Sequence, residues 1–226
     1  MLFLNITPKS NWILWKLHRL ILKRIKRWRV LQLPNGKILR IKYFAEGKFN
    51  YVFKIKGDTR LLRITRKQFY QLSHPVDTDE VCNNCKLMNS LAEKGLSVSA
   101  KHLIGGACLV DDAGSLLVKY KCCKKDEIFK VFNDLKEWSL ENKIVILDYN
   151  ERNWCKRAEI KIIDVDVNYT CLLTDIRKNK IVLKRIDVNK YNSDEMALEA
   201  FLLKEAELLW QNLIIYKKSD QERSHL

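Results

Sequence analysis

The spacing of hydrophobic positions changes along the chain. Between about residues 31 and 121, short apolar runs lie between turn-forming residues, which is typical of strands, and one segment has helical spacing. Beyond that point, apolar residues recur every three or four positions over long stretches, which is typical of helices, with a few short strand-like runs between them. This order predicts an α+β protein with two lobes, whose boundary lies near 121–126.

Turn residues divide the first lobe, residues 31–121, into antiparallel hairpins. An Asn-Gly pair at 35–36 lies between two apolar runs, and both residue types tolerate the positive φ of a tight turn. A Gly-Asp pair at 57–58 predicts a second hairpin. Three further elements are expected here: a helix over 78–94, and strands over 102–110 and 115–121 that turn at the sequence DDAG.

The second lobe, residues 122–226, is predicted to be a reduced helical lobe that also holds short strands. Five apolar residues share one face of a helix over 126–142: Ile128, Val131, Phe132, Leu135 and Trp138. Four more elements are expected: strands over 143–147 and 159–165, a hairpin over 168–186, and a long helix over 193–216. A capping box at 192–195, with Asn192 as its first residue, is expected to start the last helix.

The net charge of +15 is concentrated at the N-terminus, where residues 1–45 hold eleven Lys or Arg residues and no acid. Residues 11–30 predict a basic amphipathic helix, because one stripe is apolar and the opposite side carries the positive charge. Two interpretations are open: the helix lies on an anionic membrane surface, or its stripe packs on the rest of the protein. Nucleic-acid binding is disfavoured, because the excess of positive charge is confined to this one helix and no aromatic-rich sheet motif accompanies it.

Seven scattered cysteines favour free thiols in a reducing cytoplasm over a disulfide framework. Cys82 and Cys85 have a zinc-like spacing, but no second pair of ligands follows them, so helix cysteines are the preferred interpretation. No apolar run reaches the length of a membrane span, and no signal peptide is recognised. We therefore expect a cytoplasmic protein, with peripheral attachment to the inner face of a membrane as an option.

Three short patterns carry candidate chemistry. The first, AEGKFNYV, lies between two predicted strands, and Gly47, Phe49 and Val52 fit a loop whose backbone folds over nucleotide phosphates. The second runs from Asp148 to Asn153 after the apolar run IVIL. In the third, the apolar strand IKII ends at the acids Asp164 and Asp166. Two acids and an amide on adjacent loops provide the hard oxygen ligands that Mg²⁺ prefers.

In this order and spacing, the patterns resemble the protein-kinase-like superfamily over about residues 37–170. The segment LKEWSLENKIVILDYNERN is similar to the catalytic-loop region of the PhoP regulatory network family of small bacterial kinase-like proteins. The sequence IDVD is closer to the corresponding motif of aminoglycoside and choline phosphotransferases. The alternative is an α+β protein whose surface acids fall in this order by coincidence.

The resemblance implies ATP and Mg²⁺ as cofactors and assigns roles to individual residues. Asp148 would accept the proton of a hydroxyl acceptor, while Asn153 and Asp164, with Asp166 as an additional candidate, would bind Mg²⁺. Arg63 stands where a kinase has a lysine that contacts the α- and β-phosphates, and Glu80 is the candidate partner that orients it. Three residues would lie beside the adenine: Val118 as gatekeeper, and Lys119 and Lys121 in the hinge.

Several departures from the family pattern bear on activity. Ala45 and Asn50 replace glycines of the phosphate loop, and Arg63 replaces the lysine. No His or Arg immediately precedes Asp148, so an activation loop switched by phosphorylation is not expected. Two functions from different classes follow: an active phosphotransferase acting on a lipid, a lipopolysaccharide sugar, a small molecule or a protein, or a catalytically weak regulatory module at the membrane.

Overall fold

A computed structural model describes residues 2–3, 28–32, 37–46, 50–65, 78–119 and 123–223. The chain divides into two compact units, which are described separately below. Unit 1 comprises Met1–Lys86 and Ser99–Asp112, and unit 2 comprises Leu87–Val98 and Ala113–Leu226. Each unit is therefore assembled from two stretches of chain, whereas the sequence pattern predicted one boundary near 121–126. As predicted, the protein is a mixed α+β structure.

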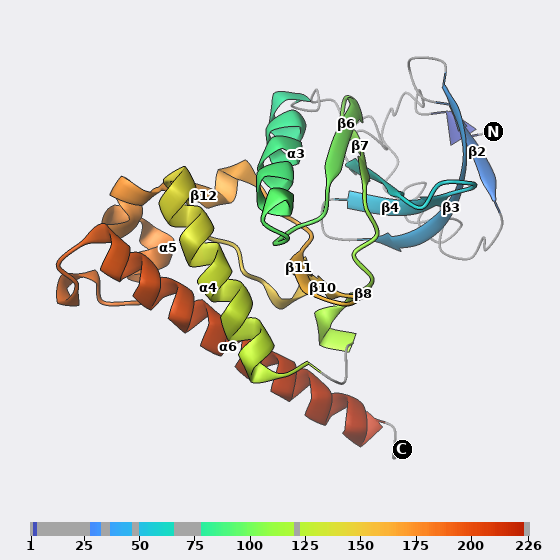
Figure 1. The fold of residues 1–226 in the computed structure, drawn as a ribbon. Helices are drawn as coiled ribbons and strands as arrows, with labels where there is room; N and C mark the ends of the chain where they lie inside the picture. Colours follow the sequence, from blue (N-terminus) through green and yellow to red (C-terminus); the bar gives the residue numbers. More distant parts are fainter. Residues whose placement is uncertain are drawn as a thin grey trace, which may run out of the picture. The chain divides into compact units, whose positions relative to one another are not determined.

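Unit 1 is built on one sheet, coloured from blue to green in Figure 1. Its strands are β1 (Leu2–Phe3), β2 (Arg29–Gln32), β3 (Ile38–Glu46), β4 (Asn50–Ile55), β5 (Leu61–Thr65), β6 (Ala100–Ile104) and β7 (Ala107–Val110). They lie in the order β1-β2-β3-β4-β5-β7-β6. All neighbouring strands are antiparallel except β1, which pairs in parallel with β2. Helix α3 (Thr78–Glu93) follows β5 and confirms the helix predicted over 78–94.

The hairpins of this sheet follow the turn residues of the sequence. Strands β2 and β3 pair on either side of the Asn-Gly sequence, which itself lies outside the described residues. Strands β4 and β5 form the second predicted hairpin, and its turn places Gly57 at φ 80°, a conformation that glycine adopts without strain. One sheet face forms a core that includes Tyr51, Phe53, Leu62 and Ile64.

The strand predicted over 102–110 is wrong, because that segment forms the separate strands β6 and β7, which pair with each other. Gly105 has φ 52°, so the chain reverses direction at the two glycines inside the predicted strand. The predicted helix over 11–30 lies mostly outside the described residues, but its last two positions, Arg29 and Val30, belong to β2. The proposed contact of that helix with a membrane stays a prediction.

Unit 2 contains helices, turns and two small sheets. Its helices are α4 (Lys125–Asn142), α5 (Lys180–Leu183) and α6 (Asp194–Arg223), and its strands are β8 (Ser115–Leu116), β9 (Ile144–Ile146), β10 (Trp154–Lys156), β11 (Ile160–Ile162) and β12 (Thr170–Leu172). Five 3-10 turns accompany them: η1 (Leu117–Lys119), η2 (Glu151–Asn153), η3 (Val167–Tyr169), η4 (Leu173–Lys178) and η5 (Val188–Lys190). Strands β8, β10 and β11 form one sheet, and β9 pairs with β12.

Helices α4 and α6 pack against each other and form the core of unit 2 (Figure 1). The predicted apolar face of α4 is confirmed, since Ile128, Phe132, Leu135 and Trp138 are buried. Helix α6 begins where it was predicted and extends beyond residue 216. The predicted cap is wrong by one residue, because the Ser193 hydroxyl, and not the Asn192 side chain, accepts a hydrogen bond from the Met196 N–H at 3.2 Å.

Two predicted strand pairings of unit 2 are also wrong. Of the predicted strand 115–121, the described residues 115–119 form the short strand β8, which pairs with β10, and a 3-10 turn. Residues 168–186 form no hairpin of their own, because β12 pairs with β9 and the chain then continues through η4 and α5. In both cases a partner distant in sequence replaces the neighbour that the local pattern suggested.

The six cysteines of the described residues are free thiols. No helix in the described ranges combines the length and the apolar character needed to cross a membrane.

Candidate active site

Two loops of unit 2 lie antiparallel and are joined at both ends. The first runs from Leu147 to Asn153, and the second from Ile163 to Tyr169. The Leu147 N–H donates to the Tyr169 carbonyl at 2.9 Å, which joins the start of the first loop to the end of the second. The Ile163 N–H donates to the Asn153 carbonyl at 2.7 Å, which joins the other two ends. The pairs β9–β12 and β10–β11 continue these contacts outward.

This arrangement brings residues of the second and third sequence patterns together. Asn153 immediately precedes β10, and it lies opposite Ile163, the residue before Asp164. Asp148 belongs to the same loop as Asn153, and the side chains of Asp148, Asn153 and Asp164 are all partly exposed. The register of two short strand pairs therefore places a base candidate and two metal-ligand candidates on adjacent loops.

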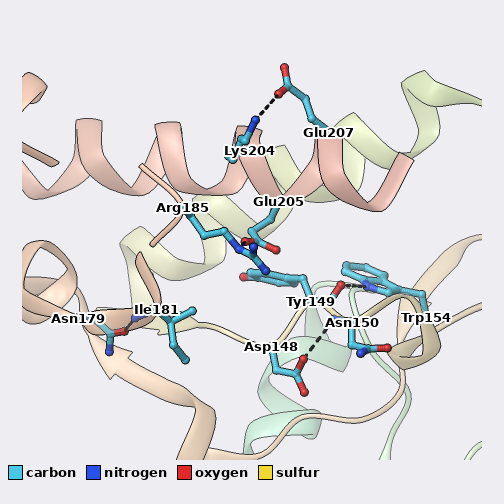
Figure 2. Close-up of polar contacts among 10 residues, drawn as sticks. All are labelled: Asp148, Tyr149, Asn150, Trp154, Asn179, Ile181, Arg185, Lys204, Glu205 and Glu207. Carbon is cyan, nitrogen blue, oxygen red and sulfur yellow. Dashed lines mark hydrogen bonds and ion pairs between the residues drawn. The ribbon is translucent and has the colours of Figure 1, made fainter. Parts of the chain in front are cut away.

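Local hydrogen bonds orient the Asp148 carboxylate. Its Oδ1 accepts from the Asn150 N–H at 3.2 Å, a contact drawn in Figure 2, and its Oδ2 accepts from Asn153 Nδ2 at 3.2 Å. The loop is further fixed by Asn150, whose side chain accepts from the Arg152 N–H at 3.0 Å and caps η2. An ionised carboxylate has about four acceptor positions, so two donors leave capacity for a substrate hydroxyl.

The same contact fixes the orientation of the Asn153 amide. Because Nδ2 donates to Asp148, the amide oxygen Oδ1 points away from that carboxylate. Oxygen is the amide atom that binds Mg²⁺, and Asp164 on the adjacent loop is the candidate for a second hard ligand. The donor set therefore fits a magnesium ion held by one amide and one carboxylate.

Asp166 fits a metal-ligand role less well than Asp164. One of its carboxylate oxygens accepts from the Asn168 N–H at 2.9 Å and caps η3. Among the residues that the structure describes, no group of three or more His, Cys, Asp or Glu side chains is arranged to hold a metal ion. Magnesium in nucleotide sites commonly takes one or two protein carboxylates and completes its shell with phosphates and water.

A cluster of four buried aromatic side chains packs beneath the Asp148 loop, on its core side. Tyr149 and Trp154 stack with ring centroids 6.1 Å apart, and Phe132 of α4 lies 5.0 Å from Tyr149 and 5.4 Å from Trp154. Phe201 of α6 contacts Tyr149 from another side, at 6.2 Å. All four side chains are buried. The position of Asp148 is therefore set by the core of unit 2 as well as by its own loop.

A buried carboxylate lies beside this cluster. Glu205 of α6 is only 7% exposed, and its Oε1 forms an ion pair with Arg185 Nε at 2.6 Å. Burial raises the pKa of Glu205, and the charge of Asp148 adds to the rise, while the Arg185 guanidinium opposes it. Burial also raises the pKa of Tyr149, with a contribution from Glu205. Figure 2 shows Arg185, Glu205 and Tyr149 grouped next to Asp148.

In unit 1, Arg63 lies in β5 and is bound by Asn50 of β4. With the Asn50 amide oxygen turned toward the guanidinium, it accepts from Arg63 Nη2 at 2.8 Å and from Nε at 3.1 Å. Val52 pairs with Arg63 across the strands, which makes Asn50 a diagonal neighbour on the same sheet face. The two residues that depart from the family pattern at these positions therefore contact each other.

Helix α3 faces the same side of the sheet as Arg63. Cys108 of β7 is the cross-strand partner of Arg63. A hydrogen bond with Cys108 and burial raise the pKa of the Cys85 thiol on α3, and the Arg63 charge opposes the rise. Glu80 lies half-buried near the start of α3. The predicted pairing of Arg63 with Glu80 stays a prediction.

The remaining predicted nucleotide contacts are only partly described. Gly47, Phe49 and Lys121 lie outside the described residues. Val52 is a half-buried residue of β4. Val118 and Lys119 lie in the 3-10 turn η1 and not in the strand that the sequence predicted.

Sequence reasoning missed Glu205 and Arg185, and it did not identify Asn50 as the partner of Arg63. Glu205 had a detectable signal, because it stands on the buried face of α6 with Phe201, Leu202 and Leu209. A carboxylate at such a position needs a cationic partner. Its partner, Arg185, lies in a segment without helical periodicity and could not be identified from spacing.

Comparison of the chain with models of known protein families finds no match, and comparison with curated proteins finds no match either.

Proposed function

We propose that this protein is a Mg-ATP-dependent phosphotransferase with a kinase-like fold, which transfers the γ-phosphoryl group of ATP to a hydroxyl acceptor. The joined pair of loops in unit 2 carries the proposal. It brings Asp148, Asn153 and Asp164 onto adjacent loops, although Asp148 and Asp164 are sixteen residues apart in sequence. Three residues of the required types in the required order are a weak signal, and their spatial convergence strengthens it.

Each residue has a specific part in the proposed reaction. Asp148 accepts the proton of the attacking hydroxyl as the acceptor oxygen bonds to the γ-phosphorus and the bond to the ADP oxygen breaks. The hydrogen bonds from Asn150 and Asn153 hold the carboxylate in one orientation for this step. Asn153 and Asp164 would hold magnesium, which when bound neutralises phosphate charge.

The residues of unit 1 that were predicted to bind the nucleotide are part of the same proposal. Gly47, Phe49 and Val52 are assigned to the nucleotide, and Arg63 to its phosphates. The hydrogen bonds that Arg63 donates to the Asn50 amide oxygen hold the guanidinium in a fixed orientation, which suits a group that binds an anion. A guanidinium is always charged and offers a planar set of donors, so it can replace a lysine in binding phosphate with different geometry.

Replacement of the proposed base tests this function. Asp148→Asn keeps the size of the side chain but cannot accept the proton, so phosphoryl transfer should fall by a factor of about 10²–10⁴ while ATP binding is retained. The matched control is Asp175→Asn, an exposed residue of η4, which should turn over ATP like the wild type. Turnover is measured as Mg-dependent release of ADP, and binding by equilibrium titration with ATP.

Two results would change the proposal. Equal turnover in Asp148→Asn and wild type would make Asp148 a structural residue. ATP binding without turnover in the wild type would support the alternative, a kinase-like regulatory module.

A further inference from the structure

Arg185 is a partly exposed arginine whose ion-pair partner is buried. Its side chain is 46% exposed, whereas the carboxylate that it contacts, Glu205, is 7% exposed. Within the described part of the chain, Glu205 is the one ion-pair partner of this guanidinium, and the contact runs through Nε. The guanidinium therefore keeps N–H donors that face water while one edge is held in place.

The burial of Glu205 calls for a physical reason. Removing a carboxylate from water costs several kcal/mol, and a single half-exposed arginine compensates this only in part. An ion pair on the surface would join α6 to the segment that follows α5 equally well without a buried charge. What the buried carboxylate adds is orientation, because it fixes an arginine that would otherwise sample many rotamers.

The surroundings of Arg185 are strongly basic. Residues 177–190 contain six Lys or Arg residues and one acid, and five of the six basic residues are exposed: Lys178, Lys180, Lys184, Arg185 and Lys190. Such a segment produces a positive potential that attracts anions. A multiply charged anion gains more from it than a singly charged one.

Arg185 and the proposed base, Asp148, lie on either side of Tyr149 (Figure 2). Glu205, the partner of Arg185, interacts electrostatically with both Asp148 and Tyr149. Figure 2 shows the Arg185 guanidinium beside Tyr149, which immediately follows Asp148 in the chain. A ligand held by Arg185 would thus bind next to Tyr149, the residue that follows the carboxylate proposed to accept the hydroxyl proton.

We infer that the acceptor is a hydroxyl compound that already carries a phosphate group, and that Arg185 binds this phosphate. The inference rests on the proposed function, which it deepens by naming the class of acceptor. A guanidinium oriented by a buried carboxylate recognises phosphate through paired, charge-assisted hydrogen bonds. The phosphate belongs either to a soluble compound, such as a sugar phosphate, or to a lipid head group.

The test measures phosphate binding without nucleotide or metal. Arg185→Gln alone would leave Glu205 as an unpaired buried charge and could prevent folding. The comparison is therefore made between Glu205→Gln and the double variant Glu205→Gln/Arg185→Gln, in which no buried carboxylate remains. The full-length variants are titrated with inorganic phosphate at low salt, and circular dichroism verifies that both are folded.

Loss of the guanidinium should weaken phosphate binding about ten- to a hundred-fold, the range for hydrogen bonds to a charged group. The matched control is Lys204→Ala, which also removes one positive charge. Lys204 neighbours Glu205 in sequence, but it contacts Glu207 on the other side of α6 (Figure 2). Its effect should stay within about two-fold, as expected for an exposed charge.

Further titrations distinguish the source of the phosphate. Glycerol 3-phosphate and glycerol represent a soluble acceptor with and without the anion. Vesicles of phosphatidic acid and of phosphatidylcholine represent the lipid. Dependence on Arg185 for either phosphate-bearing probe supports the inference and identifies its source.

Equal phosphate affinity in the single and double variants would overturn the inference, as would an equal loss in Lys204→Ala. Loss on Arg63→Ala with no loss on removal of Arg185 would assign phosphate binding to unit 1 and would also overturn it. Because the titrations contain no ATP, their failure is distinct from failure of the kinase proposal. If the protein binds phosphate through Arg185 but does not turn over ATP, the anion site stands and its role in acceptor binding is overturned.

Discussion

The Asp148 region of unit 2 and the Arg63 region of unit 1 differ in how they relate to the kinase pattern. In unit 2 the residues at the three key positions, Asp148, Asn153 and Asp164, match the pattern, and main-chain hydrogen bonds fix the loops that carry them. In unit 1 the pattern is altered at Asn50 and Arg63, and these two residues hydrogen-bond to each other.

The comparison suggests that the two substitutions belong together. Asn50 is only 8% exposed, so its amide needs a partner, and Arg63 supplies two donors. A lysine at position 63 could not form the same bidentate contact. The two altered residues of unit 1 therefore compensate each other, whereas main-chain hydrogen bonds join the loops of the unit 2 site and donors from its own loop hold Asp148.

A double-mutant cycle on Asn50 and Arg63 tests whether these substitutions are coupled. Asn50→Gly, Arg63→Lys and the double variant restore the family pattern singly and together. We expect a coupling free energy of about 1–3 kcal/mol in the free energy of unfolding, measured with urea. Each single substitution should lower the free energy of unfolding more in the wild type than in the variant that already carries the other substitution.

The same cycle on Asp58 and Lys101, two residues of unit 1 that form no hydrogen bond or ion pair with each other, serves as the reference and should give additive effects. Additivity at Asn50 and Arg63 as well would mean that the two departures from the pattern arose independently.

Replacing Glu205 should change the pH dependence of stability. The pKa of Glu205 is raised above its ordinary value of 4.5, so the folded protein binds this proton more tightly than the unfolded chain does. Stability should therefore fall as the pH rises from about 4.5 through the folded pKa. Each unit by which the folded pKa exceeds the unfolded one corresponds to about 1.4 kcal/mol.

Glu205→Gln should remove this part of the pH dependence, measured as the difference between the free energies of unfolding at pH 5 and pH 8. Glu207→Gln, a more exposed change on the same helix, should leave that difference as it is in the wild type. An unchanged difference in Glu205→Gln would show that the buried carboxylate is not responsible.

The carboxylate of Asp58 in unit 1 should show the opposite and weaker linkage. Hydrogen bonds from the Arg60 side chain and backbone lower the pKa of Asp58 from 3.8 to about 2. The stability that Asp58 contributes is present above pH 3.8 and is lost as the pH falls toward 2. Because the pair is at the surface, Asp58→Asn should have the smallest effect of these variants. Acid titration of unfolding measures it, and a rise in acid stability in the variant would contradict the assignment.

The fold was predictable where local signals coincide with the final pairing. The Asn-Gly and Gly-Asp turns identified two hairpins, and the spacing of Phe132, Leu135 and Trp138 identified α4. Predictions failed where pairing is distant in sequence. Strand β12 pairs with β9 and β8 pairs with β10, and neither choice can be read from local periodicity.

The residues of the candidate site also divide into those that the sequence predicted and those that only the structure revealed. Asp148, Asn153 and Asp164 were identified because a motif records their types and order. Arg185 and Glu205 belong to no motif, and they are brought together by the packing of α6 against the segment that follows α5. Their contact could be found only with the structure, although a glutamate among Phe201, Leu202 and Leu209 is a signal that a cation approaches that helix face.

The most direct test of the account is Mg-dependent ATP binding by Asp164→Ala. The substitution removes a partly exposed carboxylate and leaves the core unchanged, so the protein should stay folded by circular dichroism. ATP affinity is measured by equilibrium titration with and without Mg²⁺, in wild type and variant. The account predicts that Mg²⁺ strengthens ATP binding to the wild type and that this increase is abolished in Asp164→Ala. A folded Asp164→Ala protein that binds Mg-ATP as tightly as the wild type would contradict it.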